Sequence, residues 1–214
     1  MKKIFVLVAL VGSLMMAGQA NAQLSVNAGF ANQMKTYTGT VPVFGGYTDR
    51  DTSMSGFFVG ASYNLPIAGA LSVAPGIYYQ RLGHNTSSSL AVTTAHFKSV
   101  EQAIAIPILF NYSFEMSRDV DLFLFVGPNV TFGLTKTFTA WLGDTEPADP
   151  TVDYFGGDNP VNSRLNVFGT FGIGMEYHSL RFQFGYQVGL LDRTTSSNTT
   201  EKVNNLFVGV GYAL

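Results

Sequence analysis

Apolar and polar residues alternate along most of the chain after residue 22. Neighbouring side chains project from opposite faces of a β-strand, so each alternating stretch separates into an apolar row and a second row. Eight such stretches follow one another, over residues 24–33, 56–65, 72–80, 101–114, 122–135, 164–177, 180–190 and 205–214. The second row consists mainly of Gly, Ser, Asn, Gln and Thr, with few charges. This pattern predicts eight strands, each with one apolar face.

Two architectures use strands with one apolar face: a soluble β-sandwich and a membrane barrel. A sandwich buries its apolar faces between two sheets and turns polar faces to water. Charged residues make up only 12% of this chain, however, and apolar residues 46%. We therefore expect an all-β fold: an eight-stranded antiparallel up-and-down transmembrane β-barrel with lipid outside and a narrow polar lumen inside.

The connections between the predicted strands alternate in length. Short joints lie at residues 66–69, 117–120 and 178–179, and long polar ones at 35–53, 83–96, 139–163 and 192–202. Transmembrane barrels have short periplasmic turns and longer external loops. The alternation predicts four external loops and places both termini of the mature chain on the periplasmic side.

Prolines interrupt three of the predicted strands, at Pro75, Pro107 and Pro128. A proline has no N–H group to donate to a β-ladder, so it normally requires an edge or a bulge. Pro107 and Pro128 lie at similar distances from the turn near Arg118. We expect these two prolines to face one another at a local bulge or kink.

The N-terminus has the features of a secretory signal peptide. Lys2 and Lys3 precede an apolar segment over residues 4–16, and Ala20-Asn21-Ala22 forms a small-residue cleavage site. We expect residues 1–22 to be removed, leaving a single barrel domain over residues 23–214. The predicted location is the bacterial outer membrane, reached by export.

Charge and cysteine content exclude several other classes. The net charge is −2, and removal of Lys2 and Lys3 would make it −4, so nucleic-acid binding has no electrostatic basis. The chain contains no cysteine, which excludes disulfides and the acylated cysteine of a lipoprotein. Stability must then come from closure of the barrel and burial of its side chains.

Several short motifs resemble one known family. They are Ile106-Pro107-Ile108-Leu109 with Asn111-Tyr112, then residues 125–130, 172–177, 184–190 and 207–212. This set resembles the Bacteroidetes-type outer-membrane β-barrel family that includes PorT-like proteins, over nearly the whole mature chain. The resemblance implies an eight-stranded barrel inserted by the barrel-assembly machinery, and some members are linked to protein secretion. The last residue is Leu214, where a phenylalanine is commoner in such substrates.

Polar and charged residues of the second rows should form a network inside the lumen. The residues concerned are Glu101, Arg164, Glu176, Arg181, Gln183 and Gln187. Buried charges require partners, so we expect Arg164 to pair with Glu101 near the outer end and Arg181 with Glu176 near the inner end. Narrow barrels fill their interiors with side chains, which favours a structural plug. A narrow ion or proton path is the functional alternative.

Residues with catalytic or metal-binding chemistry are scarce. His84 and His96 flank one predicted loop, and 87–89 is a serine run without the strained turn of a nucleophile elbow. The third predicted loop is acidic, with Asp144, Glu146, Asp149, Asp153 and Asp158. Their irregular spacing lacks the order of a calcium loop, and weak cation binding is the alternative. We expect no catalytic residue, metal or cofactor.

The leading functional hypothesis is a non-enzymatic barrel that displays its loops for structural or binding roles. Exposed aromatic residues anchor interfaces, and the candidates are Tyr37, Phe44, Tyr47, Trp141, Tyr154 and Phe155. The expected partners are outer-membrane lipid or lipopolysaccharide and a protein bound at the external loops. The alternatives are a transport role, as a narrow pore or a protein-secretion accessory, and a small membrane-embedded enzyme acting on lipids or peptides.

Overall fold

The protein is described by a computed structural model over residues 23–41, 46–89, 93–143, 145, 147, 152–156, 162–194 and 199–214. The strands are β1 (Gln23–Val41), β2 (Gly46–Ala68), β3 (Leu71–Ser89), β4 (Thr94–Ser117), β5 (Val120–Leu142), β6 (Val152–Asp153), β7 (Leu165–Tyr177), β8 (Leu180–Gly189) and β9 (Thr199–Ala213). No helix within these ranges is long and apolar enough to cross a membrane.

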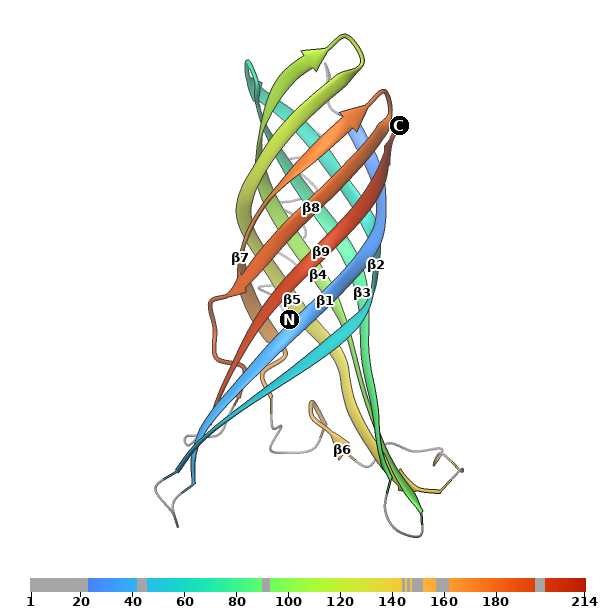
Figure 1. Ribbon diagram of the computed structural model, residues 1–214. Helices are drawn as coiled ribbons and strands as arrows, with labels where there is room; N and C mark the ends of the chain where they lie inside the picture. Colours follow the sequence, from blue (N-terminus) through green and yellow to red (C-terminus); the bar gives the residue numbers. More distant parts are fainter. Residues whose placement is uncertain are drawn as a thin grey trace.

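Eight of the strands form a closed ring (Figure 1). Each pairs antiparallel with the next along the chain, β5 pairs with β7, and β9 pairs with β1. The two-residue β6 lies outside the ring order and pairs with β5 at Thr137 and Phe138. The predicted eight-stranded up-and-down barrel is confirmed.

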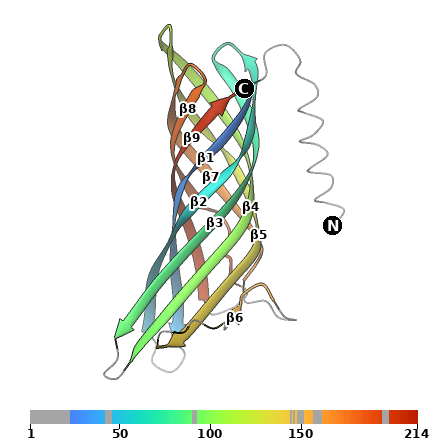
Figure 2. The ribbon, with the colours of Figure 1, turned by 90° about the vertical axis from the view of Figure 1, so that its right-hand side faces the viewer.

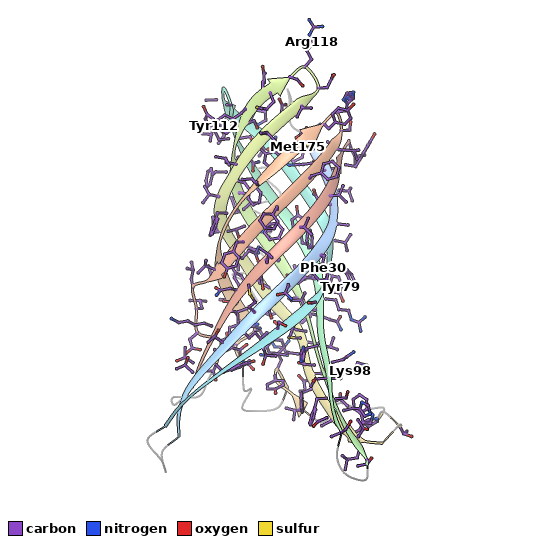
Figure 3. The ribbon with its side chains drawn as sticks, viewed as in Figure 1. Phe30, Tyr79, Lys98, Tyr112, Arg118 and Met175 are labelled. Carbon is purple, nitrogen blue, oxygen red and sulfur yellow. The ribbon has the colours of Figure 1, made fainter. Side chains whose placement is uncertain are left out.

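The outer surface of the ring is apolar. Phe30, Val126 and Ile173 project from it with exposed fractions of 51%, 60% and 57%, and Figure 3 shows Phe30 and Tyr112 pointing away from the barrel. Neighbouring residues of the second row, such as Asn27 and Phe125, are buried inside. A continuous apolar surface of this extent is stable only when hydrocarbon solvates it.

One end of the barrel, here called the turn end, closes with tight hairpins at residues 69–70, 118–119 and 178–179. Gly69 and His178 adopt the left-handed conformation there, with φ of 54° and 56°. Glycine does so without penalty, and histidine is among the residues that tolerate it. The three short turns agree with the prediction, and the C-terminus lies at the same end (Figure 1).

At the opposite end, here called the loop end, the strands run further than the alternation predicted. β1 and β2 pair as far as Val41 and Gly46, and β3 and β4 as far as Ser89 and Thr94. Most of the predicted loops 35–53 and 83–96 are therefore strand, so the predicted bounds of these two connections are wrong. Both faces are polar there, so alternation disappears although backbone hydrogen bonding continues.

The extended strands separate into two projections at the loop end. Pairing between β2 and β3 stops at Ser55 and Gly83, while each strand continues with its other neighbour. The ribbon of β1 and β2 thus leaves the sheet of β3, β4 and β5, which Figure 2 shows extending below the barrel.

The three strand prolines lie where pairing between neighbouring strands is interrupted. The strand register is the same on both sides of each interruption, so no bulge occurs there. Pro107 is the register partner of Asn129, so it is offset by one position from Pro128 instead of facing it. The ladder between β4 and β5 resumes at Phe110 and Val126 in unchanged register. The predicted face-to-face pair and bulge are wrong, because the missing N–H groups only interrupt local pairing.

Candidate functional site at the loop end of the lumen

Five buried charged side chains meet at the loop end: Lys35, Glu101, Lys136, Arg193 and Glu201, here called the ionic cluster. Each is at most 3% exposed. The Lys35 Nζ donates to Glu101 Oε2 at 2.6 Å, and the Arg193 Nη1 donates to Glu101 Oε1 at 2.7 Å. Both oxygens of the Glu101 carboxylate are therefore engaged by cations.

The second carboxylate of the ionic cluster, Glu201, has a different set of partners. The Lys136 Nζ lies 3.1 and 3.2 Å from its two oxygens and 3.1 Å from Asn162 Oδ1. The Asn162 amide also donates to Glu201. Three cations thus share two carboxylates, and Lys136 interacts electrostatically with the other four charges. Burying charges is tolerable only with such mutual pairing.

Two members of this network come from connections between strands. Arg193 follows β8 and Asn162 precedes β7, and the Asn162 Nδ2 donates to the Arg193 carbonyl at 3.2 Å. The Ser163 N–H donates to the same carbonyl at 2.8 Å. Burial alone would lower the pKa of the Arg193 guanidinium, but Glu101 and Glu201 raise it, so Arg193 stays charged. The connections are thereby tied to each other and to the barrel wall.

Phe155, just after β6, closes the lumen further. It is 5% exposed and occupies the space into which a side chain at Gly133 of β5 would project. The Arg164 guanidinium lies 4.9 Å from its ring centroid and donates to the carbonyls of Phe155 and Leu134 at 3.1 and 2.9 Å. The described part of the β5–β7 connection around Phe155 therefore folds into the barrel instead of standing away from it.

The predicted lumen residues are partly brought together. The expected pair of Arg164 with Glu101 is wrong, because Glu101 binds Lys35 and Arg193. Arg164 is exposed and precedes the first residue of β7, Leu165, so it does not belong to the inward row of that strand. Arg181 and Glu176 are register partners. Yet Arg181 lies 4.0 Å from the Phe123 ring centroid, and within the described ranges it forms no ion pair with Glu176.

The two predicted lumen glutamines are in the interior, nearer the middle of the barrel. Gln183 donates to Asn27 Oδ1 at 3.4 Å, and Gln187 accepts from Asn205 Nδ2 at 2.8 Å. They are hydrogen-bonded to other amides and belong to a layer separate from the ionic cluster. The predicted network is therefore two networks.

The predicted loop aromatics have several different environments. Tyr37 is the register partner of Glu201, Tyr154 lies with its ring 5.1 Å from Lys136 Nζ, and Trp141 stacks on His96 at 5.1 Å. Tyr47 is part of β2, but its side chain is not among those that the structure describes. Phe44 lies outside the described residues. A binding role for these residues stays a prediction.

The possible metal ligands remain dispersed in the part of the chain that the structure describes. No group of three His, Cys, Asp or Glu side chains there could hold a metal ion. Asp153 accepts the Phe155 N–H at 3.0 Å, an intraloop contact. Asp144, Glu146, Asp149 and Asp158 lie outside the described residues.

Sequence reasoning missed four charges of the ionic cluster: Lys35, Lys136, Arg193 and Glu201. A signal existed for Lys35 and Glu201, because continuing the inward rows of β1 and β9 by two or four residues places both inside. No such signal existed for Arg193, which lies in a connection without periodicity.

The closed ring, apolar exterior and filled lumen define the class as an eight-stranded bacterial outer-membrane β-barrel. Residues 17–194 match the family model described as "Outer membrane protein beta-barrel domain", and the chain belongs to this family. No curated protein matches the chain in sequence.

Several solved structures are similar to this chain in fold. Ail, the attachment invasion locus protein of Yersinia pestis, solved with the heparin analogue sucrose octasulfate, has 16% identity and a TM-score of 0.41, covering 91% of this chain and 99% of Ail. Neisserial surface protein A has 15% identity and a TM-score of 0.41, with coverage of 90% and 98%. The outer membrane enzyme PagL has 9% identity and a TM-score of 0.45, with coverage of 85% and 99%.

Proposed function

We propose that this protein is a non-enzymatic, non-conducting barrel that presents the surface of its loop end to a partner. The observation that carries the proposal is the ionic cluster, in which residues of two connections are held by charges on the barrel wall. Glu101 binds Arg193, and Glu201 binds Asn162. These contacts cross the interior, so the end that opens toward the predicted external side is occupied by the protein's own side chains.

The middle of the lumen supports the same proposal. Rings from the wall lie against inward glycines: the Phe58 ring against Gly29, the Phe125 ring against Gly172 and the Phe123 ring against Gly174. An eight-stranded barrel is only just wide enough for its own side chains. Large aromatic rings opposite glycines fill much of that width.

Planar-bilayer recordings test whether the lumen is closed. We expect the wild-type protein to show no steady conductance, and Glu101→Ala, which frees Lys35 and Arg193, to produce intermittent openings. Glu115→Ala serves as the control, because Glu115 is exposed near the turn end and is not part of the ionic cluster. An ion-selective wild-type conductance that Glu101→Ala abolishes would overturn the proposal in favour of the transport alternative.

The surface at the loop end supports a display role. The hairpin of β1 and β2 and the sheet of β3, β4 and β5 both project beyond the outward apolar rows (Figure 2), and rigid scaffolds that carry connections are common binding surfaces. We propose Trp141, stacked on His96, as one anchor. The partner is a protein or the saccharide of outer-membrane lipopolysaccharide.

Affinity capture from native envelopes tests the display role. Trp141→Ala should release a partner that the wild type retains, whereas Tyr112→Ala should retain it, because Tyr112 lies on the outer face near the turn end (Figure 3). Equal retention by both variants would count against Trp141 as the anchor. Incubation with lipids and peptides should give no turnover, and turnover would support the enzyme alternative instead.

Export and lineage are further parts of the proposal. We propose cleavage after Ala22, since Gln23 begins β1 and removal of residues 1–22 leaves the whole barrel intact. N-terminal sequencing of protein from outer membranes should begin at Gln23. The PorT-like motifs and the alternating β9 support insertion by the barrel-assembly machinery and membership of that branch. A secretion defect on gene deletion would favour the accessory role over display.

A further inference from the structure

A chamber of about 70 Å³ lies in the middle of the lumen. Six carboxamide side chains from five strands line it: Asn27, Gln80, Asn129, Gln183, Gln187 and Asn205. The remaining described lining residues are apolar, aromatic or glycine, and none of them is charged. The chamber is therefore a neutral polar site inside a membrane barrel.

The chamber is separate from the ionic cluster. Along β1 the inward residues run from Ala31, which lines the chamber, through Gln33 to Lys35. Gln33 is the register partner of Met54, and both are nearly inaccessible. A layer of one polar and one apolar side chain thus stands between the neutral chamber and the nearest charge on that strand.

Two of the carboxamides that line the chamber each hold a buried oxygen without a hydrogen-bond partner. Asn129 Oδ1 and Asn205 Oδ1 are buried and unbonded. Their neighbours already have partners: Asn205 Nδ2 donates to Gln187, and Asn27 Nδ2 donates to Ser62 and Tyr78. Carboxamides carry both donors and acceptors, so the lining suits an occupant that forms hydrogen bonds of either kind.

The other walls are aromatic. The Phe58 ring meets those of Phe207 and Tyr78 edge to face, at centroid distances of 6.0 and 5.9 Å. Such walls suit the carbon atoms of a ligand, while the carboxamides suit its polar atoms. A water molecule needs roughly 10–15 Å³ of such a cavity, so the chamber has room for about five water-sized groups.

We propose that this chamber binds a small uncharged molecule with several hydroxyl groups, of the size and chemistry of glycerol. No charged side chain lines the chamber, so a charged ligand would be buried without a counter-ion in contact with it. The inference is independent of the display role, because it concerns strand residues in the middle of the barrel and not the loop end.

Side-chain amide resonances of isotope-labelled protein in detergent micelles test the proposal. Titration with glycerol should shift the Asn129 and Asn205 amide signals to saturation. The Asn111 amide, near the turn end and bonded to Asn64 and Ser72, should not move. Acetate and ethylammonium, of similar size but charged, should give no saturable shift.

Two variants identify the site. Asn129→Leu removes one of the carboxamides that line the chamber, and Ala105→Val fills the chamber without removing a polar group. Each should weaken glycerol binding by about tenfold or more. Asn32→Ala, on the outer face and bonded to Ser55, should bind as the wild type does.

Linear shifts that never saturate would mean that the chamber holds only water, and would overturn the proposal. Unchanged affinity in Ala105→Val, or equal binding of acetate, would also overturn it. Heat-modifiable electrophoretic mobility reports folding, so if Asn129→Leu fails to fold, Ala105→Val still decides the outcome.

Discussion

The loop end of the lumen and its middle are filled in different ways, although the same strands enclose both. The loop end holds five paired charges, and one of them, Arg193, comes from a connection between strands. The middle holds carboxamides and aromatic rings that come only from strands. The strands thus determine the width and wall of the interior, while closure of the loop end also depends on the connections.

This difference changes which substitutions should be costly. In the ionic cluster, removing one partner leaves an opposite charge buried and unpaired. In the middle, adding atoms where a ring already lies against a glycine is the severe change. The two regions should respond to opposite kinds of substitution.

The largest effect is expected from Glu101→Ala. It removes the acceptor of both Lys35 and Arg193 and leaves two buried cations without it. We expect a loss of about 3–5 kcal/mol in the free energy of unfolding. Urea titration in lipid vesicles, followed by the fluorescence of the single tryptophan, Trp141, measures this loss.

Glu115→Ala is the matched control, because Glu115 is an exposed carboxylate near the turn end. It should change stability by less than about 0.5 kcal/mol. A similar small effect for both variants would mean that water screens the ionic cluster. The distinction between the two regions would then fail.

The middle of the lumen is tested by Gly172→Ala in β7. The added Cβ would collide with the Phe125 ring and the Phe184 carbonyl, of which only the ring can move. We expect a loss of about 1–3 kcal/mol from overpacking, measured by the same urea titration. Gly169→Ala on the same strand meets no atom within 4 Å and should be nearly neutral. Equal losses would point to a backbone effect of the β7 glycines instead of lumen packing.

The sequence predicts the middle of the barrel much better than the loop end, for a physical reason. Lipid outside and close packing inside force alternation, so the opposite faces of Asn27 and Phe30 could be predicted directly. Beyond Met34 both faces of β1 are polar, and the strand continues without a pattern. The chamber and its unpaired acceptors depend on side-chain conformations in three dimensions, which no row of residues encodes.

Lys136 shows a second limit of sequence reasoning. Gln102 and Ala103 of β4 pair with Thr135 and Gly133, so Leu134 is an extra residue in β5. This bulge reverses the alternation and turns Lys136 inward. Its position could not have been found by extending the row of Gly133.

A smaller and local effect is expected from Phe155→Ala. The loss of its ring should free the β5–β7 connection without unfolding the ring of strands, because Phe155 lies outside the strands. Cleavage of that connection by an added protease should accelerate by about tenfold, as local opening becomes easier. Val152→Ala, at an exposed position of β6, should be cleaved at the wild-type rate.

The smallest effect is expected from Arg164→Ala. Arg164 is exposed, its guanidinium donates to backbone carbonyls, and it contacts the Phe155 ring, so no buried charge loses its partner. The unfolding free energy should fall by no more than about 1 kcal/mol, as for exposed polar contacts. A loss as large as that of Glu101→Ala would mean that Arg164 enters the lumen in the membrane. The pairing with Glu101 expected from alternation alone would then have to be restored, and Arg193 would no longer be the residue that closes the loop end.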